Sequence, residues 1–169
     1  MRRSACRALS PAIGIVLIAP ADFHGSLLEM LDALSPEGLA DTELWTLMGG
    51  QRSQRQSLAR ILQRRKIDEE TGMMIALKHD RDVMVRGTAA QCLAAWAGEG
   101  YTYPSSVRAT ETLATEPGTQ VALGITYGVA AYPDTAIAIA IATTLVEHPS
   151  SRVRRWARSV LEPDPTGPS

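Results

Sequence analysis

Histidine and cysteine are the side chains that most often act as metal ligands or nucleophiles, and this sequence holds few of them. His24, His79 and His148 are its three histidines, and Cys6 and Cys92 its two cysteines. No histidine stands near a cysteine at metal-ligand spacing, and two cysteines cannot complete a four-ligand zinc site. His79 and His148 fall at expected turns after helices, where partial positive charge is favoured. We therefore expect no metal and a structural role for these histidines.

The spacings typical of catalytic sites do not occur either. Gly49-Gly50 is a turn without the lysine of a phosphate-binding loop, and no G-x-S-x-G or H-E-x-x-H motif is present. The acids at 68–70 suit the first turn of a helix, because carboxylates stabilise its positive end. Cys92 lies on an apolar stripe and is expected to be a small buried hydrophobe. The sequence predicts a protein that is not an enzyme and has no cofactor.

Charged side chains are the remaining candidates, and they are unevenly distributed. Lys and Arg number 17 against 18 Asp and Glu, so the net charge of −1 argues against a strongly basic nucleic-acid domain. Residues 52–66 hold six cations and no acid, and residues 152–158 hold four cations beside Trp156. Residues 98–147 hold one cation, Arg108, and five acids. The two basic segments are either solvated helix faces or a surface for an anionic partner or phosphate.

The elements that carry these charges form an internal repeat. One stripe of a helix has apolar residues at 85, 89, 92, 93 and 96, and the pattern recurs from 121 and from 153, with a weaker copy from 54. The second stripe position falls at 58, 89, 125 and 157, at intervals of 31, 36 and 32 residues. Turn residues precede each stripe in the later copies, and Arg81, Pro117 and Pro149 occupy one slot. Such spacing indicates stacked helical pairs.

Val85-Arg86 and Val153-Arg154, each after a turn and before small residues, resemble the HEAT repeat family, including its bacterial versions. The resemblance covers about residues 36–162; the third copy departs with Ala122 in place of Arg, and the first with Gln54-Arg55. It implies an all-α, armadillo-like α-solenoid of about four helical hairpins with an extended concave surface. In such stacks the arginine after the valine often bonds to an acidic turn residue of a neighbouring hairpin, which implies a structural role for Arg86 and Arg154.

The repeat register predicts the helices of each hairpin. We expect pairs at 36–48 and 53–66, 68–79 and 82–97, 105–115 and 119–131, and 135–147 and 150–162, with an N-terminal capping helix near 25–34. Ser53, with Gln56 three residues later, and Ser105 are expected to cap their helices. Ile and Ala alternate over 136–142, a pattern typical of a strand. The register nevertheless places this segment in a helix.

The two ends lie outside the expected solenoid of residues 22–162. Residues 163–169 are expected to be a disordered tail. Residues 1–21 have a basic start, an apolar middle and Ala19-Pro20-Ala21, as in a secretory signal. The alternatives are an N-terminal extension, a buried element or a start codon assigned too early. We expect a cytoplasmic protein, or an exported one if the signal is real. The longest apolar run, Ala12–Ala19, is too short to span a membrane.

The resemblance favours an interaction module over an enzyme. We expect a scaffold, regulatory or immunity-type protein that binds a protein partner with an acidic patch on the face of the second helices. The candidate contact residues are Arg55, Arg86, Tyr127, Arg154, Arg155 and Arg158. The alternative is nucleic-acid binding, as in the HEAT-like alkylpurine DNA glycosylases, which the near-neutral charge disfavours. An accessory role of the bilin-lyase type is a third reading, and the oligomeric state is left open.

Overall fold

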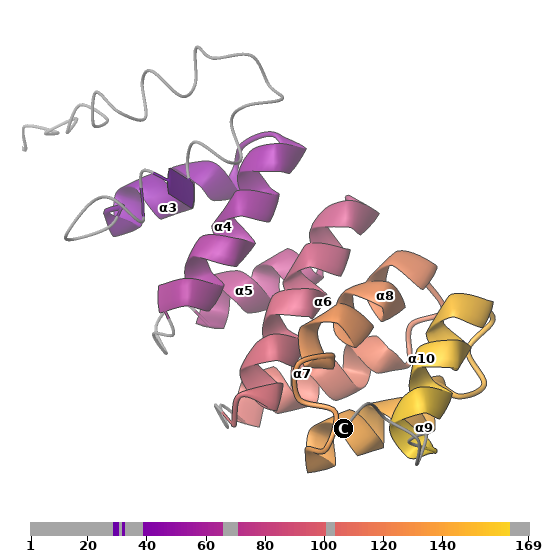
Figure 1. Cartoon of the computed structure of the whole chain (residues 1–169). Coiled ribbons are helices and arrows are strands. Elements are labelled where there is room, and N and C mark those ends of the chain that lie inside the picture. The colour runs from indigo at the N-terminus through magenta and orange to yellow at the C-terminus, as the bar shows by residue number, and fades with distance from the viewer. Residues whose placement is uncertain (1–28, 31, 33–38, 66–70, 101–103, 163–169) are drawn as a thin grey trace, which may run out of the picture. The chain divides into compact units, whose positions relative to one another are not determined.

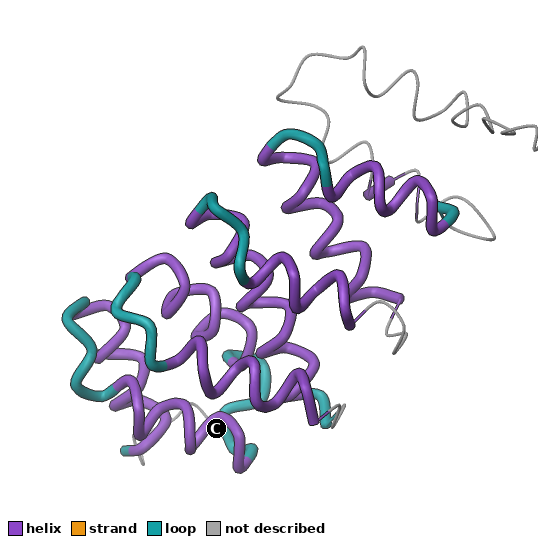
Figure 2. Tube along the Cα trace, turned by 180° about the vertical axis from the view of Figure 1, so that it is seen from behind, coloured by secondary structure: helices purple, strands orange, loops and turns teal. Residues whose placement is uncertain are grey.

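Helices make up all the regular secondary structure that the computed structural model describes, in residues 29–30, 32, 39–65, 71–100 and 104–162 (Figures 1 and 2). These residues contain eight helices and no strand, which confirms the all-α prediction. The helices are α3 (Asp41–Met48), α4 (Arg52–Arg65), α5 (Thr71–Lys78), α6 (Val83–Gly98), α7 (Pro104–Ala114), α8 (Thr119–Val129), α9 (Ala136–Leu145) and α10 (Ser151–Leu161). Only residues 29–30 and 32 of the expected capping helix are described, and they are helical. Residues 1–21 and 163–169 lie outside the described residues.

The chain divides into two compact units, residues 1–58 and 59–169, and the division falls inside α4. In the first unit, α3 buries Leu44 and Leu47. Its N-terminus is fixed by the carboxylate of Glu43, which accepts a hydrogen bond from the Ala40 N–H at 2.8 Å. On its other side α3 exposes Trp45.

The second unit contains two rows of helices. α5, α7 and α9 contact one another in sequence along one row, and α6, α8 and α10 do so along the other. Each helix of the first row also contacts the helix that follows it in the chain, through a short turn (Figure 2). The two helices of each of these hairpins therefore lie side by side, as expected for a repeat.

The apolar stripes predicted from the sequence form the core. The second helix of each hairpin is α4, α6, α8 or α10. Each of these four helices has a fully buried residue on its stripe: Ile61, Leu93, Ile125 and Ala157, respectively. The leucines placed before the turns, at 77, 113 and 145, are buried as well. In the last turn of α10 the stripe is less well covered: Val160 is partly buried and Leu161 is 37% exposed, because this is the end of the last described helix.

The helix starts differ from the predictions at one helix and at two caps. The first helix was expected from residue 36, but α3 begins at Asp41, and residues 39–40 before it are not helical. α4 begins at Arg52 instead of Ser53, and Gln54 rather than Gln56 reaches back, accepting a hydrogen bond from the Gln51 N–H at 2.6 Å. α7 begins at Pro104, so Ser105 lies inside the helix and is not its cap. Proline suits this first position because it has no N–H that would need a partner.

The segment with alternating Ile and Ala is helix α9, as the repeat register predicted. Thr135 caps it, accepting a hydrogen bond from the Ala138 N–H at 3.3 Å. Ala138, Ile141, Ala142 and Leu145 are buried on one side, at helical spacing. Strand-like alternation is overridden here because alanine favours helix and the inner face still repeats every three or four residues.

α6 and α8 pack more closely than any other helix pair of the unit, because glycines line their contact. A Cβ atom on Gly124 would overlap the carbonyl oxygen of Gly87, and one on Gly128 would overlap that of Gln91. A Cβ on Gly87 would in turn lie 2.9 Å from the carbonyl oxygen of Gln120. Only glycine permits such backbone proximity, so these residues fix the spacing of the two second helices.

Candidate functional site

The arginines of the Val-Arg pairs hold the turns of their own hairpins. Nη1 of Arg154 donates to the carbonyl oxygens of His148 and Pro149, at 2.8 and 2.7 Å. Nη1 of Arg86 donates to the equivalent carbonyls of Asp80 and Arg81, at 2.9 and 3.4 Å. The resemblance implied an acidic side chain of a neighbouring hairpin as the partner. In these two copies the guanidinium instead bonds to backbone carbonyls five and six residues earlier.

Arg55, in the first unit, makes the same kind of contact. It is buried, and its Nη1 donates to the carbonyl oxygen of Gly50 at 2.5 Å, five residues earlier. The third copy has Ala122 at this position, and Ala122 is fully buried. Three candidate contact residues, Arg55, Arg86 and Arg154, thus each commit one nitrogen to a turn.

The turn residues before α6 and α10 are also equivalent. The Asp80 carboxylate accepts a hydrogen bond from the N–H of Asp82 at 2.8 Å, and Nδ1 of His148 accepts one from the N–H of Ser150 at 3.1 Å. Nε2 of His148 is buried and has no hydrogen-bond partner among the described residues. The hydrogen bond at Nδ1 gives His148 a part in organising its own turn.

Tyr127 of α8 is exposed over half its surface and contacts Arg152 of α10. Arg152 donates from Nη2 to the Tyr127 hydroxyl, and its guanidinium carbon lies 5.5 Å from the centre of the tyrosine ring. An arginine this close to an aromatic ring is attracted by its electron-rich face. The pair therefore gives α8 and α10 one shared, ordered surface feature that is both apolar and cationic.

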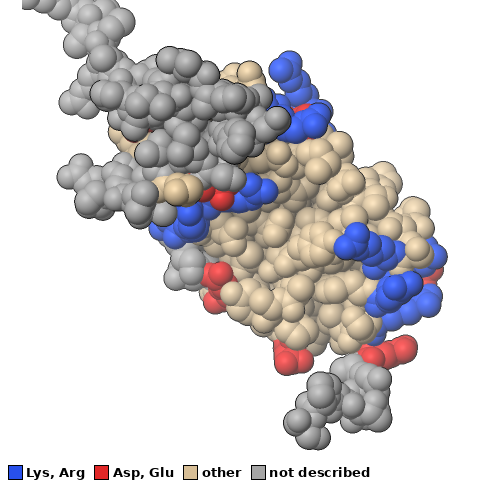
Figure 3. Space-filling view, turned by 45° about the horizontal axis from the view of Figure 1, so that its top comes forward, with Lys and Arg blue, Asp and Glu red and all other residues tan. Residues whose placement is uncertain are grey.

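Arg155 and Arg158 extend this cationic surface along α10. Both are exposed, and among the described residues neither side chain has a hydrogen bond or an ion pair. Together with Arg154 and Ser151 they line a hollow of about 280 Å³. Figure 3 shows the resulting blue surface at the end of the second unit formed by α10.

The second helices of this unit carry no acid to neutralise these cations. Within the described ranges 83–98, 119–129 and 151–161, which are α6, α8 and α10, the sequence has no Asp or Glu. Acids stand instead in the turns, as at Asp80, Glu116 and Glu147. The face of the second helices is thus neutral over α6 and α8, apart from Arg86, and basic over α10.

Of the candidate contact residues, Tyr127 lies on α8 and Arg154, Arg155 and Arg158 lie on α10, and these two helices contact each other. Arg152, which the sequence placed in the basic segment but not among the contact residues, is the direct partner of Tyr127. No sequence signal pairs the two residues, because the repeat register aligns Arg152 with Gln120 and not with Tyr127.

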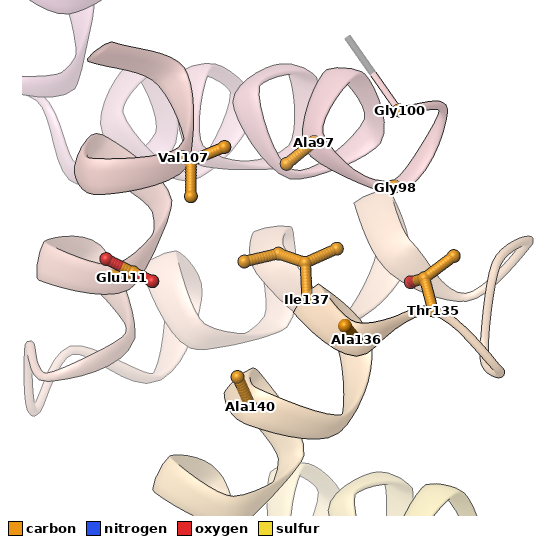
Figure 4. A pocket seen from close by; sticks show the side chains of 9 residues that line it. All are labelled: Ala97, Gly98, Gly100, Val107, Glu111, Thr135, Ala136, Ile137 and Ala140. Carbon is orange, nitrogen blue, oxygen red and sulfur yellow. The ribbon is translucent and has the colours of Figure 1, made fainter. Parts of the chain in front are cut away.

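A second hollow is apolar and lies among the ends of three helices (Figure 4). Its volume is about 420 Å³, and small residues of α6 and α9 leave the space, with Val107, Glu111 and Ile137 at its sides. The side chains of Val107 and Ile137 point into it. Among the described residues that line it, Glu111 and Thr135 are the two with polar side chains, so the hollow is suited to an apolar group.

Among the described residues, no group of three or more His, Cys, Asp or Glu side chains is placed to hold a metal ion. None of the helices in that part of the chain has the length and apolar character needed to cross a membrane.

Comparison of the chain with protein-family models, with curated proteins and with solved structures finds no match. The function must therefore be argued from the residues and their geometry alone.

Proposed function

We propose that this chain is a non-catalytic, HEAT-like α-solenoid of about four hairpins that binds a protein partner on the face of its second helices. Its place in the cell is that of a scaffold, a regulatory subunit or an immunity-type protein. Two rows of contacting helices, with a repeat of 31–36 residues, support the solenoid. The binding function follows from the surface that this arrangement presents.

The observation that carries the proposal is the stack of Tyr127 and Arg152. Tyrosine and arginine are the residues most enriched in the energetic centres of protein interfaces. Tyr127 is half exposed although it belongs to a helix whose other side is buried, and Arg152 holds its ring in one orientation. An anchor that is already ordered loses less conformational entropy when a partner covers it.

The charge around this anchor selects the partner. Arg155 and Arg158 lie on the helix that carries Arg152, and α6, α8 and α10 contribute no carboxylate. A partner with an acidic patch is therefore attracted during encounter, while basic proteins are repelled. The neutral surface of α8 beside the patch is suited to exclude water once contact is made.

Nucleic acid remains the second candidate, because the same cations attract phosphates. A base-excising enzyme of the HEAT-like type also needs an acidic group near the extruded base. The helical segments 83–98, 119–129 and 151–161 contain no acid, so this face favours binding without catalysis.

Affinity capture tests the proposal. The wild-type chain and the double variant Tyr127→Ala/Arg152→Ala are immobilised, extract of the organism that makes the chain is passed over each, and retained proteins are quantified by mass spectrometry. We expect a protein that the wild type retains and that the double variant loses by roughly tenfold or more, since removing an interface centre commonly costs over 2 kcal/mol.

Ile139→Ala is the matched control, because Ile139 is 46% exposed but lies on α9, in the other row of helices. The control should retain the same protein, and retention should fall as salt is raised. If every protein retained by the wild type is retained equally by the double variant, the second-helix face is not the binding site.

A further inference from the structure

We propose that the hollow on α10 binds a dianionic phosphoryl group, carried by a phosphorylated side chain of the protein partner. This inference rests on the proposed function and names the chemistry by which the partner is recognised. The hollow is lined by Ser151, Arg154, Arg155 and Arg158. Their spacing places one hydroxyl and three guanidinium groups on one side of a single helix.

Arg154 is the fixed member of the site. Its Nη1 donates to the carbonyls of His148 and Pro149, so the guanidinium is held against the turn. An arginine has five N–H donors, and Nη1 provides two of them. Among the described residues Nη2 and Nε of Arg154 have no partner, so they are available to a ligand in the hollow. The site therefore has one cation ordered before binding.

Arg155 and Arg158 bring charge that the protein does not neutralise. In the described part of the chain, the side chains of Arg155 and Arg158 have no hydrogen-bond or ion-pair partner. Arg158 also stands four residues after Arg154, on the same face of the helix. Like charges at this spacing destabilise a helix. An anion bound among the three removes that repulsion.

The number and type of donors favour a phosphoryl group over a carboxylate. Guanidinium groups bind phosphate oxygens through paired hydrogen bonds, and a phosphorylated side chain brings a charge near −2 and three acceptor oxygens. A carboxylate brings one charge and two oxygens, which one arginine can satisfy by itself. Three arginines and the hydroxyl of Ser151 around 280 Å³ therefore exceed what an Asp or Glu side chain needs.

Inorganic phosphate is the first probe. The ¹⁵N-labelled chain is titrated with phosphate at constant ionic strength, and the Nε–Hε signals of its arginines are followed by NMR. We expect saturable shifts of Arg154, Arg155 and Arg158 with one common dissociation constant, and little shift of Arg81, an exposed arginine in a turn. Linear shifts, or shifts of equal size at Arg81, would show nonspecific screening and overturn the site.

Variants establish which residues hold the anion. Arg155→Gln/Arg158→Gln removes two cations and keeps a polar side chain at each position, and it should weaken phosphate binding by about tenfold or more. Arg81→Gln is the control, with equal affinity to the wild type expected. If the double variant binds phosphate as tightly as the wild type, α10 is not the site.

Two peptides that differ at one position, phosphoserine or glutamate, then test the source of the anion. We expect the phosphoserine peptide to displace phosphate and to bind at least about tenfold more tightly than the glutamate peptide. Equal binding of the two peptides would overturn the phosphoryl assignment. Binding to vesicles with phosphoinositide headgroups, but not to the phosphoserine peptide, would overturn the assignment to a protein.

The outcome is separable from that of the proposed function. If phosphatase treatment of the extract leaves capture of the partner unchanged, the phosphoryl site is wrong and the second-helix face still stands. If capture does not depend on Tyr127 and Arg152, the proposed function is wrong. The phosphate titration then still decides, independently of capture, whether α10 binds the anion.

Discussion

Arg154 and Arg155 are neighbours in the chain, yet only the first is fastened to the protein. Arg154 donates two hydrogen bonds to turn carbonyls, whereas Arg155 is exposed and has no partner among the described residues. One arginine therefore holds a turn, and the other supplies charge. The two roles can be separated by measurement.

Arg154→Met should lower the free energy of unfolding by about 1–2 kcal/mol, because it removes a charged donor from two carbonyls of a partly buried turn. Arg155→Met should change it by less than about 0.5 kcal/mol, as surface substitutions away from such contacts do. Urea denaturation of the two variants gives the comparison. Equal effects would mean that the turn contacts add nothing.

The sequence predicted a structural role for Arg86 and Arg154, but not the atoms to which they bond. The repeat places these arginines after a turn, which is visible in the residue pattern. Every residue has a backbone carbonyl, so the sequence does not show which carbonyl an arginine bonds to. It therefore could not be predicted that these arginines bond to turn carbonyls instead of an acidic side chain. The contact between Tyr127 and Arg152 was also missed, because it joins two copies of the repeat.

At the scale of the element, α6 and α8 show how strongly a helix pair can depend on residues without side chains. Gly87, Gly124 and Gly128 let the two backbones touch, and this contact sets the spacing of the second helices. Glycine lowers the stability of a helix relative to alanine. Its presence inside both α6 and α8 therefore indicates that the close approach of the two backbones requires it.

Gly124→Ala should destabilise the second unit by at least about 1–3 kcal/mol, because the new methyl group overlaps a carbonyl oxygen that cannot move aside easily. Gly72→Ala, at an exposed position of α5, is the matched control. Nothing lies within 4 Å of its new methyl group, so alanine should leave stability unchanged or raise it by up to about 1 kcal/mol. Thermal unfolding followed by circular dichroism distinguishes these signs.

The core stripe supports a further prediction. Leu93 is fully buried on α6, and Leu93→Ala should cost about 2–5 kcal/mol through lost apolar burial and the cavity left behind. Gln91→Ala, at an exposed position of the same helix, should cost little. An unchanged urea midpoint for Leu93→Ala would contradict the register.

Helix positions could be predicted from the sequence to within a few residues, because apolar periodicity and the repeat register agree. The caps of α4 and α7 could not be predicted from the sequence, and the two serines expected there are not caps. A cap depends on which residue first leaves helical geometry, and α4 starts one residue before Ser53. The close approach of α6 and α8 was equally hidden, since glycine in a helix gives no sign of what it faces.

For the whole molecule, charge separates the candidate functions better than fold does. The chain is nearly neutral, with its cations concentrated in two segments, so a long nucleic-acid duplex would meet acids elsewhere on the surface. We expect duplex DNA at about 150 mM salt to bind no more tightly than the 10⁻⁴–10⁻⁶ M of nonspecific contacts. A gel-shift assay that showed sub-micromolar affinity there would promote the nucleic-acid candidate.

The binding kinetics of the captured partner test the central claim most directly. Tyr127→Ala should speed dissociation with little change in the association rate, because an interface centre acts after encounter. Arg155→Glu/Arg158→Glu should slow association by roughly tenfold and reduce its dependence on salt, while Arg81→Glu should leave both nearly unchanged. Surface plasmon resonance at several salt concentrations gives these rates. An association rate that the charge reversal on α10 does not alter would contradict the account.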